Sequence, residues 1–321
     1  MANHIPIFLS ADDNYAPFVA TTIASICYTT KYYIDFFVLD GGISKFNKMQ
    51  IESLQVKFIN FSIEFIKIET SELINYFHLT NAGKHLTIST YSRFLIPQIK
   101  ENIDRVIYLD VDIIALSDII ELYNEDIAHH HIGAVPKYHN KIERQKFKNV
   151  FNLSVEHKYF NAGVLLINCK KWRNDKITEK IFDLSQKFHD TLNDADQGLL
   201  NIYFDNSYKQ LDYKYNIMTN DQCKKGYPQT DVVLRHFNDY PKPWNNRNFS
   251  NRPIQNFNEF WFFASLTPFY AGMCQSFLAN MLVNAGVKQE ELFNNIKKPS
   301  TALLGELRKK LSSGEQKHAD L

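Results

Sequence analysis

Two carboxylates separated by a single residue, Asp110 and Asp112, are the residues in this chain whose spacing most strongly suggests chemistry. They follow Arg105–Leu109, an apolar, β-branched and aromatic run that is typical of a buried strand. In extended backbone, residues two apart project to the same face, about 7 Å apart along the strand. Two acids placed in this way repel each other unless a cation lies between or beside them. We therefore interpret the pair as ligands of a divalent metal that holds a polyphosphate.

A simpler alternative is a strand that ends in a solvated turn, in which the Asp112 side chain hydrogen-bonds its own backbone. The Asp-x-Asp pattern is so short that it often occurs by chance. The choice between the two interpretations depends on what the rest of the chain places beside the pair.

The elements that must position the pair indicate an α/β fold. Strands and helices alternate early in the chain, in the predicted order strand 5–10, helix 16–29, strand 34–39, helix 44–58 and strand 61–68. This alternation is typical of a parallel sheet with helices on its faces, in which ligands bind beyond the carboxyl ends of the strands. The chain contains neither a G-x-G-x-x-G motif nor a Walker lysine loop, so neither a dinucleotide cofactor nor a P-loop is implied.

The later elements are less regular. After a polar loop over 70–90, we predict a short helix over 91–96 that Pro97 ends, a helix from 117, a strand over 132–135, a loop or exposed helix over 137–157, a strand over 163–168, helices over 172–189 and 194–201, and a strand over 232–236. The last strand ends on His236 and leads into a loop that carries Lys242 between two prolines.

Two short groups of residues in this part of the chain have a structural and a functional interpretation. The small residues Asn161, Ala162 and Gly163 allow backbone to approach a ligand closely, although a β-bulge explains the glycine as well. Asp196 and Gln197 fall in the first turn of a predicted helix. An acid is favoured there by the helix dipole, so simple capping by Asp196 is an alternative to a functional role.

Composition excludes several classes of protein. Among 321 residues, 36 Lys and Arg face 35 Asp and Glu, so the basic excess of a nucleic-acid-binding protein is absent. The four cysteines are widely scattered, as expected of reduced thiols rather than a disulfide framework or a zinc site. The N-terminal stretch lacks the charge and apolar pattern of a signal peptide, and no segment reaches the ~18 apolar residues of a membrane span. We therefore expect a cytoplasmic location.

Six blocks of residues, in order over 5–245, resemble the retaining glycosyltransferases of family eight, the glycogenin and lipopolysaccharide galactosyltransferase family, and among them those of lipooligosaccharide α-1,4-galactosyl transfer. The blocks are Ala11-Asp-Asp-Asn-Tyr15, Thr90-Tyr-Ser-Arg93, Tyr108-Leu-Asp-Val-Asp112, Phe160-Asn-Ala-Gly-Val-Leu-Leu-Ile-Asn168 with Lys171-Trp172-Arg173, Asp196-Gln197, and His236 with Lys242-Pro-Trp244. The resemblance implies a GT-A fold, a Rossmann-like mixed, mainly parallel sheet flanked by helices, over residues 1–250. A small helical extension over 251–321 would pack on it.

The resemblance also implies ligands for a metal and a donor. Asp110, Asp112 and His236 would hold Mn²⁺, with Mg²⁺ as an alternative, because two carboxylate oxygens and an imidazole suit the borderline ion better. The metal would neutralise the diphosphate of a UDP-sugar and stabilise the departing UDP. The residues that would contact the nucleotide sugar are Ser10, Asp12, Asn14, Tyr15, Arg93, Asp110, Val111, Asn161, Ala162, Asp196 and Lys242.

The two catalytic residues that the resemblance implies are Gln197, near the anomeric carbon, and Asp196, on the sugar hydroxyls. Retention of anomeric configuration ordinarily uses a carboxylate nucleophile. Because Gln197 is an amide, the resemblance points instead to front-face attack, in which the leaving phosphate helps to deprotonate the acceptor. Asp196 as the nucleophile is the alternative.

The function implied is a Mn²⁺-dependent, retaining transfer of a hexose, galactose slightly ahead of glucose, from a UDP-sugar to a saccharide acceptor. The setting would be lipopolysaccharide, lipooligosaccharide or other surface glycan synthesis. Two positions depart from the pattern. Lys137 stands where the α-1,4-galactosyltransferases of lipooligosaccharide synthesis have an acid that touches the donor sugar, and Asp239 stands where the family usually has a glycine. They leave open a non-catalytic protein that binds nucleotide sugars. A sugar nucleotidyltransferase is a further alternative, but the stretch from Ser10 to Tyr15 lacks its glycine- and lysine-rich loop.

Basic residues near the C-terminus raise the question of membrane contact. Lys297-Lys298 and Arg308-Lys309-Lys310 flank a predicted amphipathic helix. A solvated charged face is the simpler interpretation, and weak peripheral contact with the inner face of the membrane is the alternative.

Overall fold

The computed structural model of the chain describes residues 4–68, 88–137, 141–188, 191–192, 195–219, 221, 230–238, 242–244 and 256–284. The chain divides into two compact units, one formed by Met1–Tyr240 with Gln255–Tyr270 and the other by Pro241–Ile254 with Ala271–Leu321. The first unit holds the sheets and, of the predicted site residues, all but Lys242. The predicted division into a catalytic domain over 1–250 and a C-terminal extension stays a prediction.

A seven-stranded sheet with the order β3-β2-β1-β4-β7-β6-β8 lies at the centre of the first unit. Its strands are β1 His4–Ala11, β2 Tyr33–Asp40, β3 Phe61–Lys67, β4 Arg105–Leu109, β6 Ile132–Pro136, β7 Phe160–Asn168 and β8 Lys209–Gln210. Strand β7 runs antiparallel to β4 and β6, and the other neighbouring pairs are parallel. The predicted mixed, mainly parallel sheet is therefore confirmed.

A second sheet of three strands, with the order β5-β10-β9, was not predicted from the sequence. It consists of β5 Ile113–Ala115, β9 Ile217–Met218 and β10 Leu234–His236. Strand β10 runs antiparallel to β5, with His236 opposite Ile113. Because Ile113 follows Asp112 directly, this pairing carries a histidine from late in the chain to the acidic pair.

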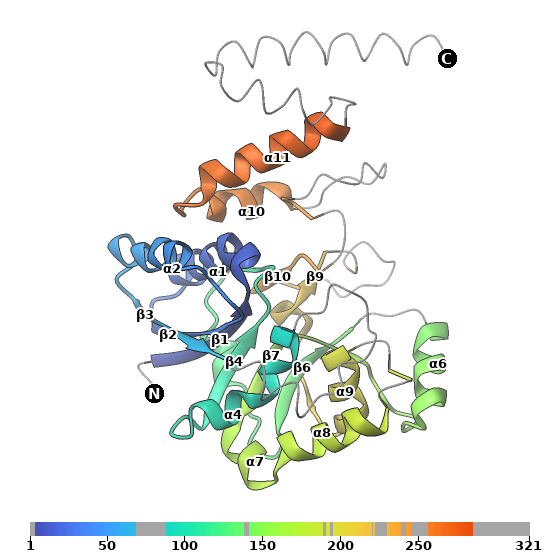
Figure 1. Cartoon of the computed structure of the whole chain (residues 1–321). Helices are drawn as coiled ribbons and strands as arrows, with labels where there is room; N and C mark the ends of the chain where they lie inside the picture. The colour runs from blue at the N-terminus through green and yellow to red at the C-terminus, as the bar shows by residue number, and fades with distance from the viewer. Residues whose placement is uncertain are drawn as a thin grey trace, which may run out of the picture. The chain divides into compact units, whose positions relative to one another are not determined.

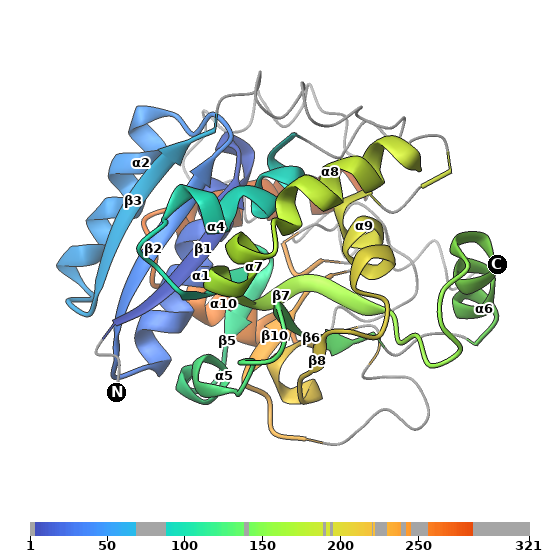
Figure 2. The same cartoon turned by 90° about the horizontal axis from the view of Figure 1, so that it is seen from below.

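The helices lie on both faces of the large sheet. Helices α1 and α10 lie on one side, and α4, α7 and α8 lie on the other (Figures 1 and 2). The α-helices are α1 Ala16–Thr29, α2 Lys45–Glu52, α4 Ile96–Ile99, α5 Ile120–Asn124, α6 Lys141–Phe151, α7 Cys169–Asn174, α8 Ile177–Lys187, α9 Ala195–Phe204, α10 Phe257–Ala264 and α11 Tyr270–Asn284. Short 3-10 helices are η1 Asp13–Tyr15, η2 Ser53–Val56, η3 Ile88–Leu95 and η4 Tyr213–Tyr215. Among the described residues, no helix is long and apolar enough to cross a bilayer.

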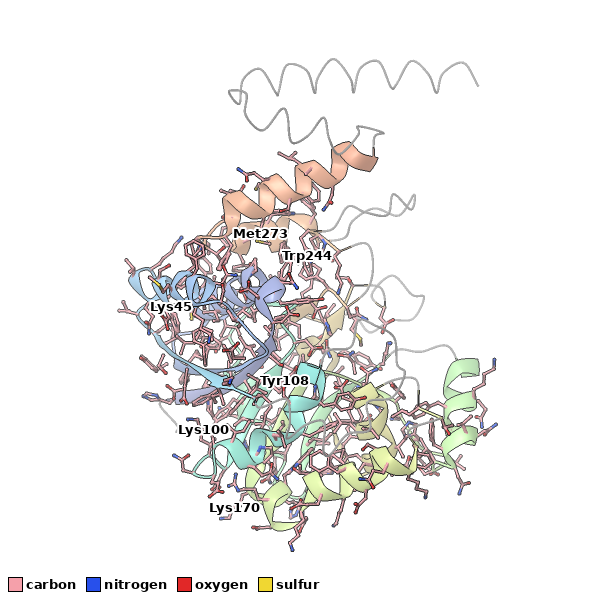
Figure 3. The ribbon with its side chains drawn as sticks, in the orientation of Figure 1. Lys45, Lys100, Tyr108, Lys170, Trp244 and Met273 are labelled. Carbon is pink, nitrogen blue, oxygen red and sulfur yellow. The ribbon has the colours of Figure 1, made fainter. Side chains whose placement is uncertain are left out.

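The central strands are buried because both faces of the sheet are covered. Ile5, Ile7 and Leu9 of β1 are fully buried, and so are Ile107 and Leu109 of β4. Figure 3 shows Tyr108 of β4 inside the unit, whereas Lys100 and Lys170 lie at its periphery. This rigid core holds the carboxyl ends of β1 and β4 side by side, with Phe8 in register with Tyr108.

Two of the predicted helix boundaries are wrong, for physical reasons. Pro97 does not end a helix but lies in the first turn of α4, where a missing N–H costs no hydrogen bond. The predicted helix over 172–189 is two helices, because Lys176 adopts a left-handed conformation with φ 51° at the junction. The stretch over 137–157, left open between loop and helix, contains α6.

Candidate functional site

Three side chains that could bind a metal converge beyond the carboxyl end of β4. The ligand atoms of Asp110, Asp112 and His236 all lie within 4.8 Å of one another. The Nε2 atom of His236 lies 3.1 Å from Oδ1 of Asp112. One ion with bonds of about 2 Å can hold donors that lie about 4 Å apart, so this set fits a divalent cation after small shifts.

The two sheets explain why these residues meet. Asp110 and Asp112 lie between β4 and β5, and the Phe237 N–H donates to the Asp112 carbonyl at 2.9 Å. This bond continues the β5–β10 pairing and keeps His236 beside the turn. His236 is 2% exposed and its Nε2 faces Asp112, so this turn packs against a buried histidine.

Arg93 connects the metal-binding group to the rest of the site. Its Nη2 donates to Asp110 Oδ1 at 3.2 Å, and its Nη1 donates to the Ala162 carbonyl at 2.7 Å. Its Nε lies 2.8 Å from Asp196 Oδ2, and the guanidinium lies 4.4 Å from the ring centroid of Tyr108. The Tyr108 hydroxyl donates to Asp110 Oδ1 at 2.9 Å. Arg93 is 7% exposed, so this contact set is largely shielded from water.

Asp196 is a buried carboxyl in the first turn of α9. It is 4% exposed, and burial raises its pKa to about 6, although Arg93 opposes the shift. Because Arg93 is its ion-pair partner, Asp196 does more than cap the helix. The same pairing raises the pKa of Arg93 against the effect of its burial, so the guanidinium stays charged at all relevant pH values.

Gln197, the next residue, is held by three neighbours. Its Oε1 accepts from Asn161 Nδ2 at 3.0 Å and from the Ala162 N–H at 3.1 Å, and its Nε2 donates to the Tyr159 hydroxyl at 3.1 Å. The predicted small-residue entry at 161–163 therefore lies beside the predicted catalytic pair.

Gly163 lies where no side chain fits. A Cβ there would come within 2.5 Å of His236 Cε1, 2.8 Å of Asp110 Oδ2 and 3.0 Å of Asn161 Oδ1. The structure requires a glycine here because the side chains of His236, Asp110 and Asn161 approach it, and the predicted close approach of a ligand stays a prediction.

The residues predicted to contact the nucleotide lie at the carboxyl end of β1. Ser10 lies 3.2 Å from Ser92, oxygen to oxygen, and Asp12 caps η1 by accepting from the Asn14 N–H at 3.0 Å. Tyr15 is 48% exposed and therefore accessible to a ligand. Since β1 and β4 are adjacent and parallel, these residues and Asp110 share one edge of the sheet.

The remaining residues of the sequence prediction are Val111, Lys137, Lys242 and Asp239. Val111 is buried, and its carbonyl accepts from the Thr22 hydroxyl at 3.1 Å. Lys137 follows β6, and its N–H donates to the Tyr159 carbonyl at 2.8 Å. Lys242 belongs to the second unit, where its Nζ lies 5.6 Å from the Trp244 ring centroid, and Asp239 lies outside the described residues.

The sequence did not predict three residues of the site, which are Tyr108, Tyr159 and Asn216. Tyr108 could have been found, because it lies two residues before Asp110 and so shares its face of the strand. Tyr159 adjoins the predicted entry at 161–163. Asn216, which contacts both His236 and Asn161, carries no signal in the sequence.

Comparison with known proteins shows the family to which the chain is similar. The family described as glycosyl transferase family 8 matches residues 6–248. A Haemophilus influenzae protein named as a glycosyltransferase is 28% identical over 246 residues, which cover 75% of this chain and 73% of that protein. A lipopolysaccharide 1,2-glucosyltransferase of Escherichia coli is 29% identical over 172 residues, 49% of this chain and 50% of that protein.

Solved structures show the same fold. The galactosyltransferase LgtC, in complex with donor and acceptor sugar analogs, has a TM-score of 0.73 and 25% identity and covers 84% of this chain and 100% of its own. The predicted GT-A fold is confirmed by this likeness. The chain therefore belongs to glycosyl transferase family 8, and it is a glycosyltransferase of glycan synthesis.

Proposed function

We propose that the chain is a Mn²⁺-dependent, retaining glycosyltransferase that moves a hexose from a UDP-sugar to a saccharide acceptor. The observation that carries this proposal is the convergence of Asp110, Asp112 and His236 at the sheet edge that Ser10 and Asp12 also reach. Two carboxylates and an imidazole favour Mn²⁺, with Mg²⁺ as the alternative. A bound cation would supply Lewis-acid stabilisation to the leaving diphosphate.

The chain's own side chains prepare the site for this chemistry. Arg93 donates to Asp110 and pairs with Asp196, so it fixes one metal ligand and one residue of the sugar pocket together. The hydroxyl of Tyr108 donates to the same Asp110 oxygen and leaves Oδ2 for a cation. Lys242, fixed between two prolines, would add positive charge to the diphosphate, as the family resemblance implies.

The arrangement favours front-face attack over a protein nucleophile. Gln197 uses its amide oxygen and nitrogen in hydrogen bonds to Asn161, Ala162 and Tyr159, which makes it a positioning group for the sugar. Asp196 is 4% exposed, and its Oδ2 lies against Arg93, which reduces its ability to attack an anomeric carbon. The leaving phosphate would then accept the proton of the attacking hydroxyl.

Galactose is our first choice of donor sugar and glucose the second. LgtC, a galactosyltransferase, supports the first, and the lipopolysaccharide glucosyltransferase supports the second. Lys137, beside Tyr159, stands where the α-1,4-galactosyltransferases of lipooligosaccharide synthesis have an acid, and it is a candidate determinant of this choice. The acceptor we propose is a lipopolysaccharide or other surface glycan, made in the cytoplasm with at most weak membrane contact through the C-terminal segment.

A donor screen tests the proposal. The purified protein is mixed with Mn²⁺ and one of several UDP-hexoses without acceptor, and slow UDP release is measured. We expect release from UDP-galactose or UDP-glucose and loss of release in Asp112→Asn, with full release in Asp183→Asn, a matched change on the exposed face of α8. The order of preference between the two sugars names the donor.

Other outcomes of the screen identify the alternatives. Binding of UDP and Mn²⁺ without release from any donor indicates a non-catalytic binding protein. Pyrophosphate formation from UTP and a sugar phosphate indicates a nucleotidyltransferase. Near-normal release by Asp112→Asn contradicts the metal assignment. Recovery of the protein with anionic vesicles at low salt tests membrane contact separately.

A further inference from the structure

Three side-chain amides form a continuous hydrogen-bonded chain between the sugar side of the site and the metal side. The Tyr159 hydroxyl accepts from Gln197, whose oxygen accepts from Asn161 Nδ2 at 3.0 Å. The Asn161 oxygen accepts from Asn216 Nδ2 at 2.8 Å, and Asn216 Oδ1 lies 3.0 Å from His236 Nδ1. We call these three residues, Gln197, Asn161 and Asn216, the amide chain.

Two backbone N–H groups fix the direction of this chain. The Ala162 N–H donates to Gln197 Oε1 at 3.1 Å, and the Gly163 N–H donates to Asn161 Oδ1 at 3.0 Å. A backbone N–H can only donate, so both amides must present oxygen to β7. Neither amide can be turned over without placing an NH₂ group against an N–H.

The fixed oxygen of Asn161 determines the orientation of Asn216. Since Asn161 presents an acceptor, Asn216 must present its NH₂ group, and its Oδ1 then faces His236. An amide oxygen can only accept, so the hydrogen of the imidazole belongs on Nδ1. Nε2, which faces Asp112 at 3.1 Å, is then the nitrogen with a lone pair for a metal.

We propose that Asn216 is the positioning residue of the metal site, and that the amide chain links the orientation of His236 to the orientation of Gln197. The proposal deepens the proposed function and depends on its metal site. Asn216 is fully buried and Asn161 is 7% exposed, so loss of either partner would leave a polar group unsatisfied rather than hydrated.

Metal affinity of Asn216 variants tests the proposal without use of turnover. Mn²⁺ binding is measured by electron paramagnetic resonance in wild type, Asn216→Leu and Asn216→Asp. The leucine removes the acceptor for Nδ1–H, so we expect affinity to fall by about 10- to 100-fold. A carboxylate keeps that acceptor but cannot donate to Asn161 Oδ1, so we expect Asn216→Asp to keep its affinity within about threefold. We also expect it to lower UDP release, because two facing oxygens repel each other and disturb the contact of Asn161 with Gln197.

The matched control is Asn168→Asp. Asn168 caps α7 by accepting from the Lys171 N–H at 3.0 Å, and an aspartate caps a helix equally well. We expect its Mn²⁺ affinity to equal that of wild type. If Asn216→Leu binds Mn²⁺ as tightly as wild type, the inference is wrong although the proposed function stands. If wild type itself does not bind Mn²⁺ or Mg²⁺, both fail.

A second measurement determines directly which nitrogen of His236 carries the hydrogen in the wild-type protein. Long-range ¹H–¹⁵N spectra of the histidine side chains are recorded on wild type with Mg²⁺ and UDP, and His236 is assigned by its absence from His236→Gln. We expect the His236 hydrogen on Nδ1. A hydrogen on Nε2 in the metal-loaded protein overturns the inference, whatever the variants do.

Discussion

At the scale of single residues, Gly163 shows how little space the site leaves. A β-carbon at this position would lie 2.5 Å from His236 and 2.8 Å from Asp110, closer than real carbon contacts. We therefore expect Gly163→Ala to displace the metal ligands, to lower UDP release at least tenfold and to cost about 1–3 kcal/mol of stability.

Gly272→Ala is the matched control for this prediction. Nothing lies within 4 Å of a Cβ at Gly272, which is inside α11, so alanine there is expected to be neutral or to stabilise by about 0.5–1 kcal/mol. Steady-state donor hydrolysis measures the UDP release of each variant, and urea unfolding measures its free energy of unfolding. Full activity of Gly163→Ala would show that the cluster adapts more freely than its packing implies.

Asp196 gives the site a predictable pH dependence. Burial raises its pKa from the ordinary value of 3.8 to about 6, so between these values the folded protein holds a proton that the unfolded chain has released. The free energy of unfolding therefore falls as pH rises through this window. Asp196→Asn lacks the titration, and its stability relative to wild type should increase by about 2–3 kcal/mol between pH 4 and pH 7.

Urea unfolding of both proteins at the two pH values measures this difference. The sign of this change in relative stability is informative, because burial raises the pKa of Asp196 whereas the ion pair with Arg93 lowers it. A relative stability of the variant that decreases with pH would mean that Arg93 stabilises the carboxylate more than burial penalises it.

The residues that could be predicted are those whose neighbours in sequence are also their neighbours in space. Asp110 and Asp112 were found because they are separated by one residue and directly follow an apolar run that the sequence shows to be a strand. Asn216 was not found, because its contacts to His236 and Asn161 span 20 and 55 residues. Nothing in a single sequence reports such contacts.

At the scale of elements, the metal-binding cluster depends on short strands. Strands β5, β9 and β10 have three, two and three residues, too few to show an alternating pattern, and this is why the second sheet was missed. The long strands β1, β2 and β3 were predicted to within two residues of each end, because their apolar runs are bounded by polar residues.

Helix α10 supports β10 through an ion pair. Arg235, the neighbour of His236, is 5% exposed and pairs through Nε and Nη2 with Glu259 of α10. Glu259→Gln leaves a buried guanidinium without its carboxylate. We therefore expect the free energy of unfolding to fall by about 1–3 kcal/mol and Mn²⁺ to bind more weakly. Thermal unfolding and the binding measurement give the two effects.

Glu121→Gln serves as the control for Glu259→Gln. Glu121 pairs with Lys214 at 2.7 Å, but its side chain is 66% exposed, and such pairs contribute little. We expect the free energy of unfolding of Glu121→Gln to differ from that of wild type by less than about 0.5 kcal/mol. Equal effects of the two variants would show that α10 does not support the strand.

At the scale of the whole molecule, metal binding should stabilise the fold. The cluster draws its candidate ligands from segments 124 residues apart, Asp112 and His236, so a bound cation would join parts of the chain that are distant in sequence. At a concentration about 100 times its dissociation constant, a bound cation adds about 2.7 kcal/mol to the free energy of unfolding. We expect Mn²⁺ to raise the Tm by several degrees, EDTA to reverse this, and Asp110→Asn to abolish it.

The location of the cation itself is the most direct test of the account. Crystals of the protein grown with Mn²⁺ and UDP are measured at the manganese absorption edge. We predict one strong anomalous peak bonded to Asp110, Asp112 and Nε2 of His236, with UDP oxygens completing its coordination. Well-ordered UDP with no peak among these three side chains, or a peak bound elsewhere, would contradict the central claim.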